Sequence, residues 1–246
     1  PFSVCAIFDC PWPEQVFQFT VVNYTQKGIP DQFITANAAL SLTGQELDEL
    51  QDRLVQANVK VIEYELMRVV NFDQGSPFYN LVNLSEKKQQ DKIGYKTMVQ
   101  VAKRWYQGKN DAVKQIIDNI YPDVKGKKKE AVRIRIERWQ KEDWGRFFKA
   151  FWGVVYNNFK GAKTKDGYDL WAVGYSNLMI AVVLLELQEA FLTNLGHQDE
   201  SFFEVKDADD PVGKMVEKTE NRAQKFVQYV PADLFAREWG TKSLNT

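Results

Sequence analysis

Cysteine and histidine are scarce in this sequence of 246 residues. It contains two cysteines, Cys5 and Cys10, and one histidine, His197. A structural zinc site needs about four Cys or His ligands, so a Cys/His metal site is excluded, whereas a carboxylate site for a hard cation is not. We assign no metal ligand. A bridge between the two cysteines would constrain little of the chain, so we expect reduced thiols and a cytoplasmic protein.

The motifs of several common enzyme classes are also absent. No GxxxxGK[ST] loop occurs, no GxGxxG follows the first predicted strand, and there is no GxSxG elbow. His197 comes just after a predicted helix, where it is interpreted as a C-terminal cap or an exposed residue rather than a catalytic base. Catalytic residues and cofactors therefore stay unknown, and whether the protein is an enzyme stays open.

The longest apolar stretch does not have the composition of a membrane span. Leu170–Leu192 is long enough to cross a bilayer, but it contains Asn177, Gln188 and two acids, Glu186 and Glu189. Acidic side chains are costly inside a membrane. We therefore predict a buried core helix over 169–194 and no membrane partner.

Periodicity predicts an α+β fold that is predominantly α-helical. A short apolar stretch predicts a buried strand at 3–8, residues 59–70 could form a strand or a helix, and 73–77 has the composition of a turn. Thr43 and Glu46 form a capping box ahead of a helix at 44–57. The other expected helices lie at 13–22, 30–41, 94–107, 110–120, 130–159, 211–229 and 231–239, with an acidic loop at 199–210.

Charge is strongly segregated along the chain, although the net charge is only −1. Residues 1–120 carry 12 basic and 14 acidic groups, and residues 166–246 carry 7 and 14. Residues 121–165, in contrast, carry 13 basic and 5 acidic groups. A polyanion partner, which the net charge alone would not suggest, is consistent with this basic segment.

The basic segment has three open interpretations. Its cations could contact phosphates, form the solvated face of an amphipathic helix, or pair with the acidic C-terminal region. We expect the interleaved aromatic residues Trp139, Trp144, Phe147 and Phe148 to face the core. The residues proposed for the phosphate-contacting surface are Lys125, Lys127, Lys128, Lys129, Arg133, Arg135 and Arg138.

One N-terminal segment resembles a family signature. Phe17–Pro30 is similar to the "F…IN" helix end and "kTQkk(I/V)P" sequence of the DGQHR-domain proteins, with matches at Asn23, Thr25, Gln26, Lys27, Ile29 and Pro30. A Leu-Thr-x-x-Glu-Leu helix start follows at 42–47. The turn at 73–78 resembles the family's "D..SPF", and the aromatic segment 144–160 looks like its helical part.

The resemblance implies a fold and a division of the chain. The family includes the DndB proteins associated with DNA phosphorothioate modification, and its N-terminal domain is similar to ParB. Residues 1–88 would then be the C-terminal part of a DGQHR (ParB-like) domain, and 89–246 an α-helical domain. The Asp-Gly-Gln-His-Arg motif itself is absent, so we expect this chain to begin inside the domain, after that motif.

The same resemblance implies a DNA-associated regulator or accessory protein of a DNA-modification or antiphage-defence system. Its partners would be DNA and protein components of such a system, with the oligomeric state open. Asn23, Thr25, Gln26 and Lys27 could contact a nucleotide or DNA, or Asn23 could be a helix C-cap with Thr25 and Gln26 holding the turn. The alternative functions are a nucleotide-hydrolysing ParB-like enzyme and a non-catalytic protein-interaction module.

Overall fold

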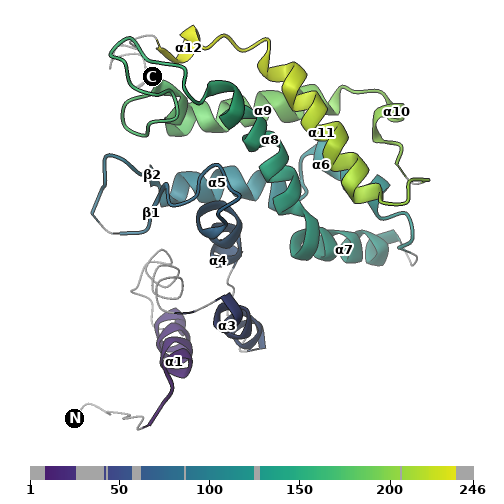
Figure 1. The fold of residues 1–246 in the computed structure, drawn as a ribbon. Helices are drawn as coiled ribbons and strands as arrows, with labels where there is room; N and C mark the ends of the chain where they lie inside the picture. The colour runs from purple at the N-terminus through teal and green to yellow at the C-terminus, as the bar shows by residue number, and fades with distance from the viewer. Residues whose placement is uncertain are drawn as a thin grey trace. The chain divides into compact units, whose positions relative to one another are not determined.

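The structure is a computed structural model, shown in Figure 1, and it describes residues 9–25, 42, 44–56, 62–85, 87–124, 128–205 and 207–236. The strand predicted at 3–8, the helix predicted at 30–41 and Thr43 of the capping box lie outside these residues. The chain divides into two compact units. Unit 1 comprises Pro1–Arg68 and Leu84–Lys87, and unit 2 comprises Val69–Asn83 and Lys88–Thr246.

Unit 1 contains three described helices: α1 (Trp12–Thr25), α3 (Gly44–Gln56) and α4 (Ile62–Met67). The helices predicted at 13–22 and 44–57 are therefore confirmed, and the ambiguous segment 59–70 is helical from Ile62 onward. Among the described residues, Val16, Leu42, Leu50, Leu54 and Tyr64 form a buried cluster in this unit. Arg53 of α3 pairs with Glu14 of α1 at 2.5 Å and stacks on Phe17, which joins the two helices outside this cluster.

Unit 2 is built almost entirely from helices. A π-helical turn, η1 (Arg68–Phe72), leads into it, and two short parallel strands, β1 (Val82–Asn83) and β2 (Ile93–Gly94), pair Val82 with Ile93. The remaining elements are α5 (Tyr95–Tyr106), α6 (Asp111–Ile120), α7 (Lys128–Arg138), η2 (Trp139–Asp143), α8 (Trp144–Phe159), η3 (Asn177–Met179), α9 (Ala181–Gly196), α10 (Glu200–Phe203), α11 (Pro211–Val227) and α12 (Asp233–Ala236). The described chain is thus predominantly helical, as predicted.

Three elements of unit 2 differ from the predictions. The helix expected at 169–194 begins only at Ala181, because Gly174 takes a left-handed φ angle of 83° and Ser176 caps the short turn η3 instead. The long element expected at 130–159 is interrupted by the π-helical turn η2. The acidic loop at 199–210 contains α10, whose first turn is capped by Asp199.

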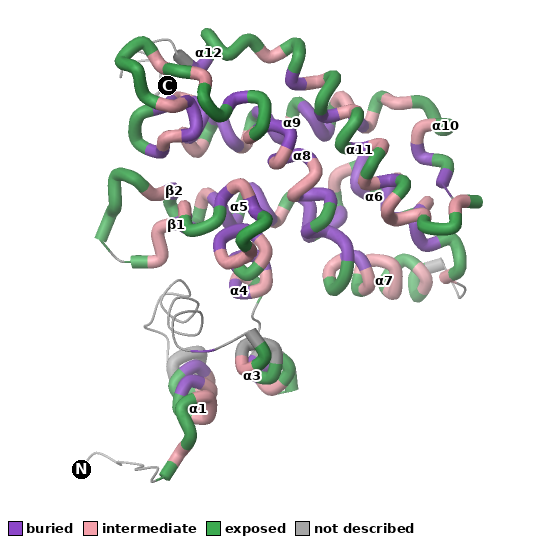
Figure 2. The backbone as a smooth tube through the Cα atoms, viewed as in Figure 1, coloured by how far each residue is buried: buried purple, intermediate pink, exposed green. Residues whose placement is uncertain are grey.

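Aromatic side chains make up much of the core of unit 2. Trp139, Trp144, Phe147 and Phe148 are all buried, which confirms that they face the core. Phe151 of α8 stacks on Phe191 of α9 with their ring centroids 4.4 Å apart. Figure 2 shows buried residues along α5, α6, α8 and α9. The core thus lies between these helices and α11, which also has a buried face, and leaves α7 at the edge.

One polar side chain, Gln188 of α9, is completely buried inside this core. Its Oε1 accepts hydrogen bonds from the indole N–H groups of Trp105 (3.0 Å) and Trp152 (2.8 Å), and its Nε2 donates to the Val101 carbonyl (2.9 Å). Trp105 and Val101 belong to α5 and Trp152 to α8, so one carboxamide joins three helices. Every bond replaces a contact with water that burial has removed.

Replacing Gln188 with leucine tests this connection. Gln188→Leu leaves two buried indole N–H groups without an acceptor and removes the additional bond to the helical carbonyl of Val101, so we expect the free energy of unfolding to fall by about 2–4 kcal/mol. Urea denaturation followed by circular dichroism measures it. The matched control is Glu189→Gln, a substitution of the residue that follows Gln188 in α9. It removes only the exposed ion pair between Glu189 and Arg104, so the free energy of unfolding should fall by less than about 1 kcal/mol. Equal losses in the two variants would contradict the assignment.

Candidate nucleic-acid interface

The residues predicted from the N-terminal signature are only partly described. Asn23 and Thr25 lie in the last turn of α1, but their side chains are not described, and Gln26 and Lys27 lie outside the described residues. Lys125 and Lys127 lie outside as well, and Lys128 is described only as the first residue of α7. The site is therefore built from the four other predicted basic residues, Lys129, Arg133, Arg135 and Arg138.

Two of these four residues attach α7 to the rest of unit 2. Arg135 pairs with Asp118 of α6 at 2.8 Å. Arg138 lies over the ring of Tyr121, 4.6 Å from its centroid, and pairs with Asp123 at 3.6 Å and Glu142 at 3.3 Å. A guanidinium group that already has such partners would have to break them to reach a phosphate. Arg135 and Arg138 therefore act mainly as structural residues.

The other two basic residues of α7 are differently placed. Lys129 is exposed, and the side chain of Arg133 is 63% exposed while pairing with Glu137 at 2.8 Å. A solvent-exposed pair four residues apart on a helix stabilises it by only about 0.3–0.5 kcal/mol. A phosphate could therefore displace Glu137 at little cost. Lys141 in η2, eight residues after Arg133, is exposed too.

The acids that pair with α7 come from neighbouring segments. Asp118 and Asp123 belong to α6 and the loop after it, and Glu137 and Glu142 belong to α7 and η2. The described partners of these arginines therefore do not come from the acidic C-terminal region 166–246. These four acids and the exposed Glu130 of α7 equal in number the five cations of α7 and η2 whose side chains are described, but Lys129 and Lys141 are exposed and belong to none of these pairs.

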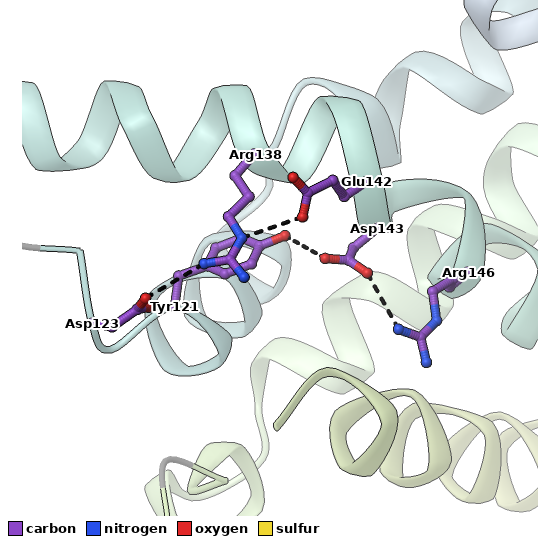
Figure 3. Close-up of polar contacts among 6 residues, drawn as sticks. All are labelled: Tyr121, Asp123, Arg138, Glu142, Asp143 and Arg146. Atoms are coloured by element: carbon purple, nitrogen blue, oxygen red, sulfur yellow. Dashed lines mark hydrogen bonds and ion pairs between the residues drawn. The ribbon is translucent and has the colours of Figure 1, made fainter. Parts of the chain in front are cut away.

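A buried hydrogen bond lies beneath this surface (Figure 3). The hydroxyl of Tyr121 donates to Oδ2 of Asp143 at 2.6 Å, and Arg146 approaches the other carboxylate oxygen at 3.3 Å. Tyr121 is fully buried and Asp143 is only 6% exposed. Burial, followed by the hydrogen bond to Asp143, raises the pKa of Tyr121 above its usual range. This bond links the end of α6 to the π-helical turn η2.

Tyr121 and Asp143 were not singled out by the sequence. A signal was present, because Trp139, Asp143 and Phe147 are spaced four residues apart and place one acid on an otherwise apolar stripe. The partner of that acid could not be inferred, since Tyr121 is 22 residues away. A π-helical turn is also invisible to a periodicity of 3.6 residues.

The turn that resembles the "D..SPF" pattern lies elsewhere in unit 2. Asp73 accepts a hydrogen bond from the Gly75 N–H at 2.8 Å and pairs with Lys149 of α8 at 2.6 Å. Burial would raise the pKa of Asp73, but the hydrogen bonds from Lys149 and Gly75 outweigh it and hold this pKa below its usual range. These contacts give Asp73 a structural role, and they occupy Lys149, another cation of the basic segment.

Other predicted features can be placed in the described chain. His197 is exposed and is the C-cap residue of α9, as predicted. In the part of the chain that is described, no group of three or more His, Cys, Asp or Glu residues is arranged to hold a metal ion. Among the described helices, none combines the length and apolar character needed to cross a membrane.

Removing the Tyr121 hydroxyl should lower stability in a pH-dependent way. Tyr121→Phe leaves a carboxylate oxygen of Asp143 without its donor, at a cost of about 1–3 kcal/mol near neutral pH. The pKa of Tyr121 is higher in the folded than in the unfolded protein. Its contribution to the free energy of unfolding is therefore complete below the unfolded-state pKa of about 10 and is lost as the pH rises further. The gap between wild type and Tyr121→Phe should then narrow by about 1.4 kcal/mol per pH unit.

Urea denaturation between pH 7 and pH 11 measures this gap. The matched control is Tyr229→Phe, since the ring of Tyr229 is 86% exposed and water already solvates its hydroxyl. This control should match the wild type near neutral pH. A gap for Tyr121→Phe that stays constant up to pH 11 would contradict the prediction.

Comparison with known proteins leaves the family unassigned. No family model, no curated protein and no solved structure matches this chain.

Proposed function

We propose that this protein is a DNA-associated regulator or accessory protein of a DNA-modification or antiphage-defence system. It binds duplex DNA through Lys129, Arg133 and Lys141, the exposed basic residues of α7 and η2. The system is suggested by the resemblance of Phe17–Pro30 and of the turn at 73–78 to the DGQHR-domain proteins. The binding surface is suggested by the charge and exposure of α7, so these two parts of the proposal rest on separate observations.

The binding surface is proposed because the basic residues of α7 have different surroundings. Arg135 and Arg138 face acids and an aromatic ring of unit 2, while Lys129 and Arg133 point into solvent from the same helix. Because Arg135 and Arg138 hold α7 to unit 2, the backbone that carries the exposed cations is fixed before binding. Less backbone freedom is then lost on binding a polyanion, which favours affinity.

Electrostatics also explains why a protein with a net charge of −1 could bind a phosphate backbone. Binding releases counterions from the nucleic acid locally, wherever cations replace them, so the charge of the contacting surface matters more than the total. The excess of basic over acidic residues is concentrated in 121–165, which includes α7 and η2. Distant acidic groups are screened within about 10 Å at 0.1 M salt.

A titration with duplex DNA tests the proposal. The logarithm of the affinity should fall linearly with the logarithm of the salt concentration. In the double variant Lys129→Gln/Arg133→Gln, affinity should drop about tenfold or more, and the salt slope should decrease by about 1 for each lost phosphate contact. Fluorescence anisotropy of a labelled duplex at several salt concentrations measures both quantities.

The matched control has the same net charge. Lys214→Gln/Lys225→Gln removes two exposed cations from α11 and should leave both affinity and salt slope close to those of the wild type. Binding that is absent in the wild type, shows no salt dependence, or falls equally in the two double variants would overturn the proposal. Loss of a protein complex in Lys129→Gln/Arg133→Gln, with duplex binding intact, would select the protein-interaction module instead.

A further inference from the structure

A pocket of about 500 Å³ lies in unit 2, away from α7. Three segments form it: the turn 74–81, the C-terminal half of α8 and the loop after that helix. The residues that decide its chemistry are Gln74, Tyr79, Gly153, Tyr156, Asn157 and Trp171. Its size lies within the range of roughly 300–1,000 Å³ that is usual for small-molecule sites.

The aromatic residues of this pocket include both fixed and accessible rings. Trp171 is held by a hydrogen bond from its indole N–H to the Pro77 carbonyl at 3.1 Å and meets Tyr156 edge to face at 5.2 Å. Tyr79, on the turn, is 39% exposed. Because Trp171 fixes Tyr156 from one side, the aromatic wall exists before any ligand arrives. Such a wall can stack on the face of a planar ring.

The polar groups of the pocket are neutral and available. The carboxamides of Gln74 and Asn157 and the hydroxyls of Tyr79 and Tyr156 make no hydrogen bond to any described residue. The charges nearby are already engaged, since Asp73 pairs with Lys149 and the ammonium of Lys160 lies 5.0 Å from the centre of the Tyr156 ring. The ligand portion that enters should therefore be uncharged.

Gly153 makes room for the ligand. A Cβ atom built on this residue would meet nothing within 4 Å, so the helix surface is open at this point. Glycine inside a helix is less stable than alanine by about 0.8–1 kcal/mol. Because Gly153 has no side chain, the surface of α8 leaves space between Tyr156, Asn157 and the turn.

We propose that this pocket binds a nucleobase. A nucleobase is planar and uncharged, and its edge carries a donor beside an acceptor. A carboxamide side chain also has a donor beside an acceptor and can pair with that edge through two hydrogen bonds, while tyrosine rings stack on the face. The base can come from a free nucleoside or from an unpaired position of a nucleic-acid strand, and both sources have the same ring chemistry. This site is independent of α7.

Filling the pocket tests the proposal. Gly153→Leu places a side chain in the open space and should weaken binding of adenosine, guanosine, cytidine or thymidine at least about tenfold, by removing the stacking and burial of the ring. Gly153→Ala is the matched control, because a methyl group leaves most of the space free. Both variants should unfold at or above the wild-type temperature, since each replaces a helical glycine. Isothermal titration or ligand-detected NMR measures the binding.

A second pair of variants tests the hydrogen bonds. Asn157→Ala removes one carboxamide and should weaken binding of the preferred nucleoside about three- to tenfold. Asn158→Ala removes the same group from the next exposed residue of α8, which does not line the pocket, and should have no effect. A mixed-sequence single-stranded 12-mer, titrated into the same variants, shows whether the base is also taken from a strand.

The outcomes separate this inference from the proposed function. Binding of a nucleoside or of the single strand that is lost in Gly153→Leu and kept in Gly153→Ala supports the pocket. The inference is overturned if neither probe binds, or if both bind Gly153→Leu as well as the wild type. The variant Lys129→Gln/Arg133→Gln should keep nucleoside binding, so a failure of the duplex experiment and a failure of this one can be told apart.

Discussion

The structure of unit 2 depends on the buried carboxamide of Gln188. It accepts from the indoles of Trp105 and Trp152 and donates to Val101, and so fixes α9 against α5 and α8. Apolar packing alone would hold these helices together, but it tolerates small rotations and shifts. Three directional hydrogen bonds in a dry core permit one arrangement, because any shift leaves a polar group without a partner. The direction of α8, and with it the positions of its two ends, follows from this arrangement.

Both candidate sites are attached to α8. At its N-terminal end the π-helical turn η2 widens one turn of the helix and turns Trp139 and Asp143 toward the core, where Asp143 meets Tyr121. That bond, together with Arg135 and Arg138, holds α7 at the edge of unit 2 with other cations facing solvent. In the C-terminal half of α8, Gly153, Tyr156 and Asn157 border the pocket. The helix α8 therefore lies between the charged surface of α7 and η2 and the neutral pocket.

In the basic segment, tertiary structure decides which cations are paired with acids and which remain exposed. Thirteen cations between residues 121 and 165 look alike in the sequence. In the folded chain, Arg135, Arg138 and Lys149 are held by acids of unit 2, whereas Lys129 and Lys141 remain exposed. Ion pairs between segments far apart in sequence cannot be inferred from composition. The surface available to a phosphate is therefore smaller than the basic segment suggests.

The sequence by itself determined the predominantly helical fold of the described chain, the helices at 44–56, 95–106 and 111–120, and the burial of the aromatic stripe from Trp139 to Phe148, because these depend on local spacing. Only the tertiary structure decided that the apolar stretch starts its helix at Ala181, that η2 interrupts the long helix, and that Tyr121 meets Asp143. It alone also assembled the pocket, from residues between 74 and 171. The physical reason is that periodicity reports which face of a segment is apolar, whereas partners and cavities arise only when distant segments pack.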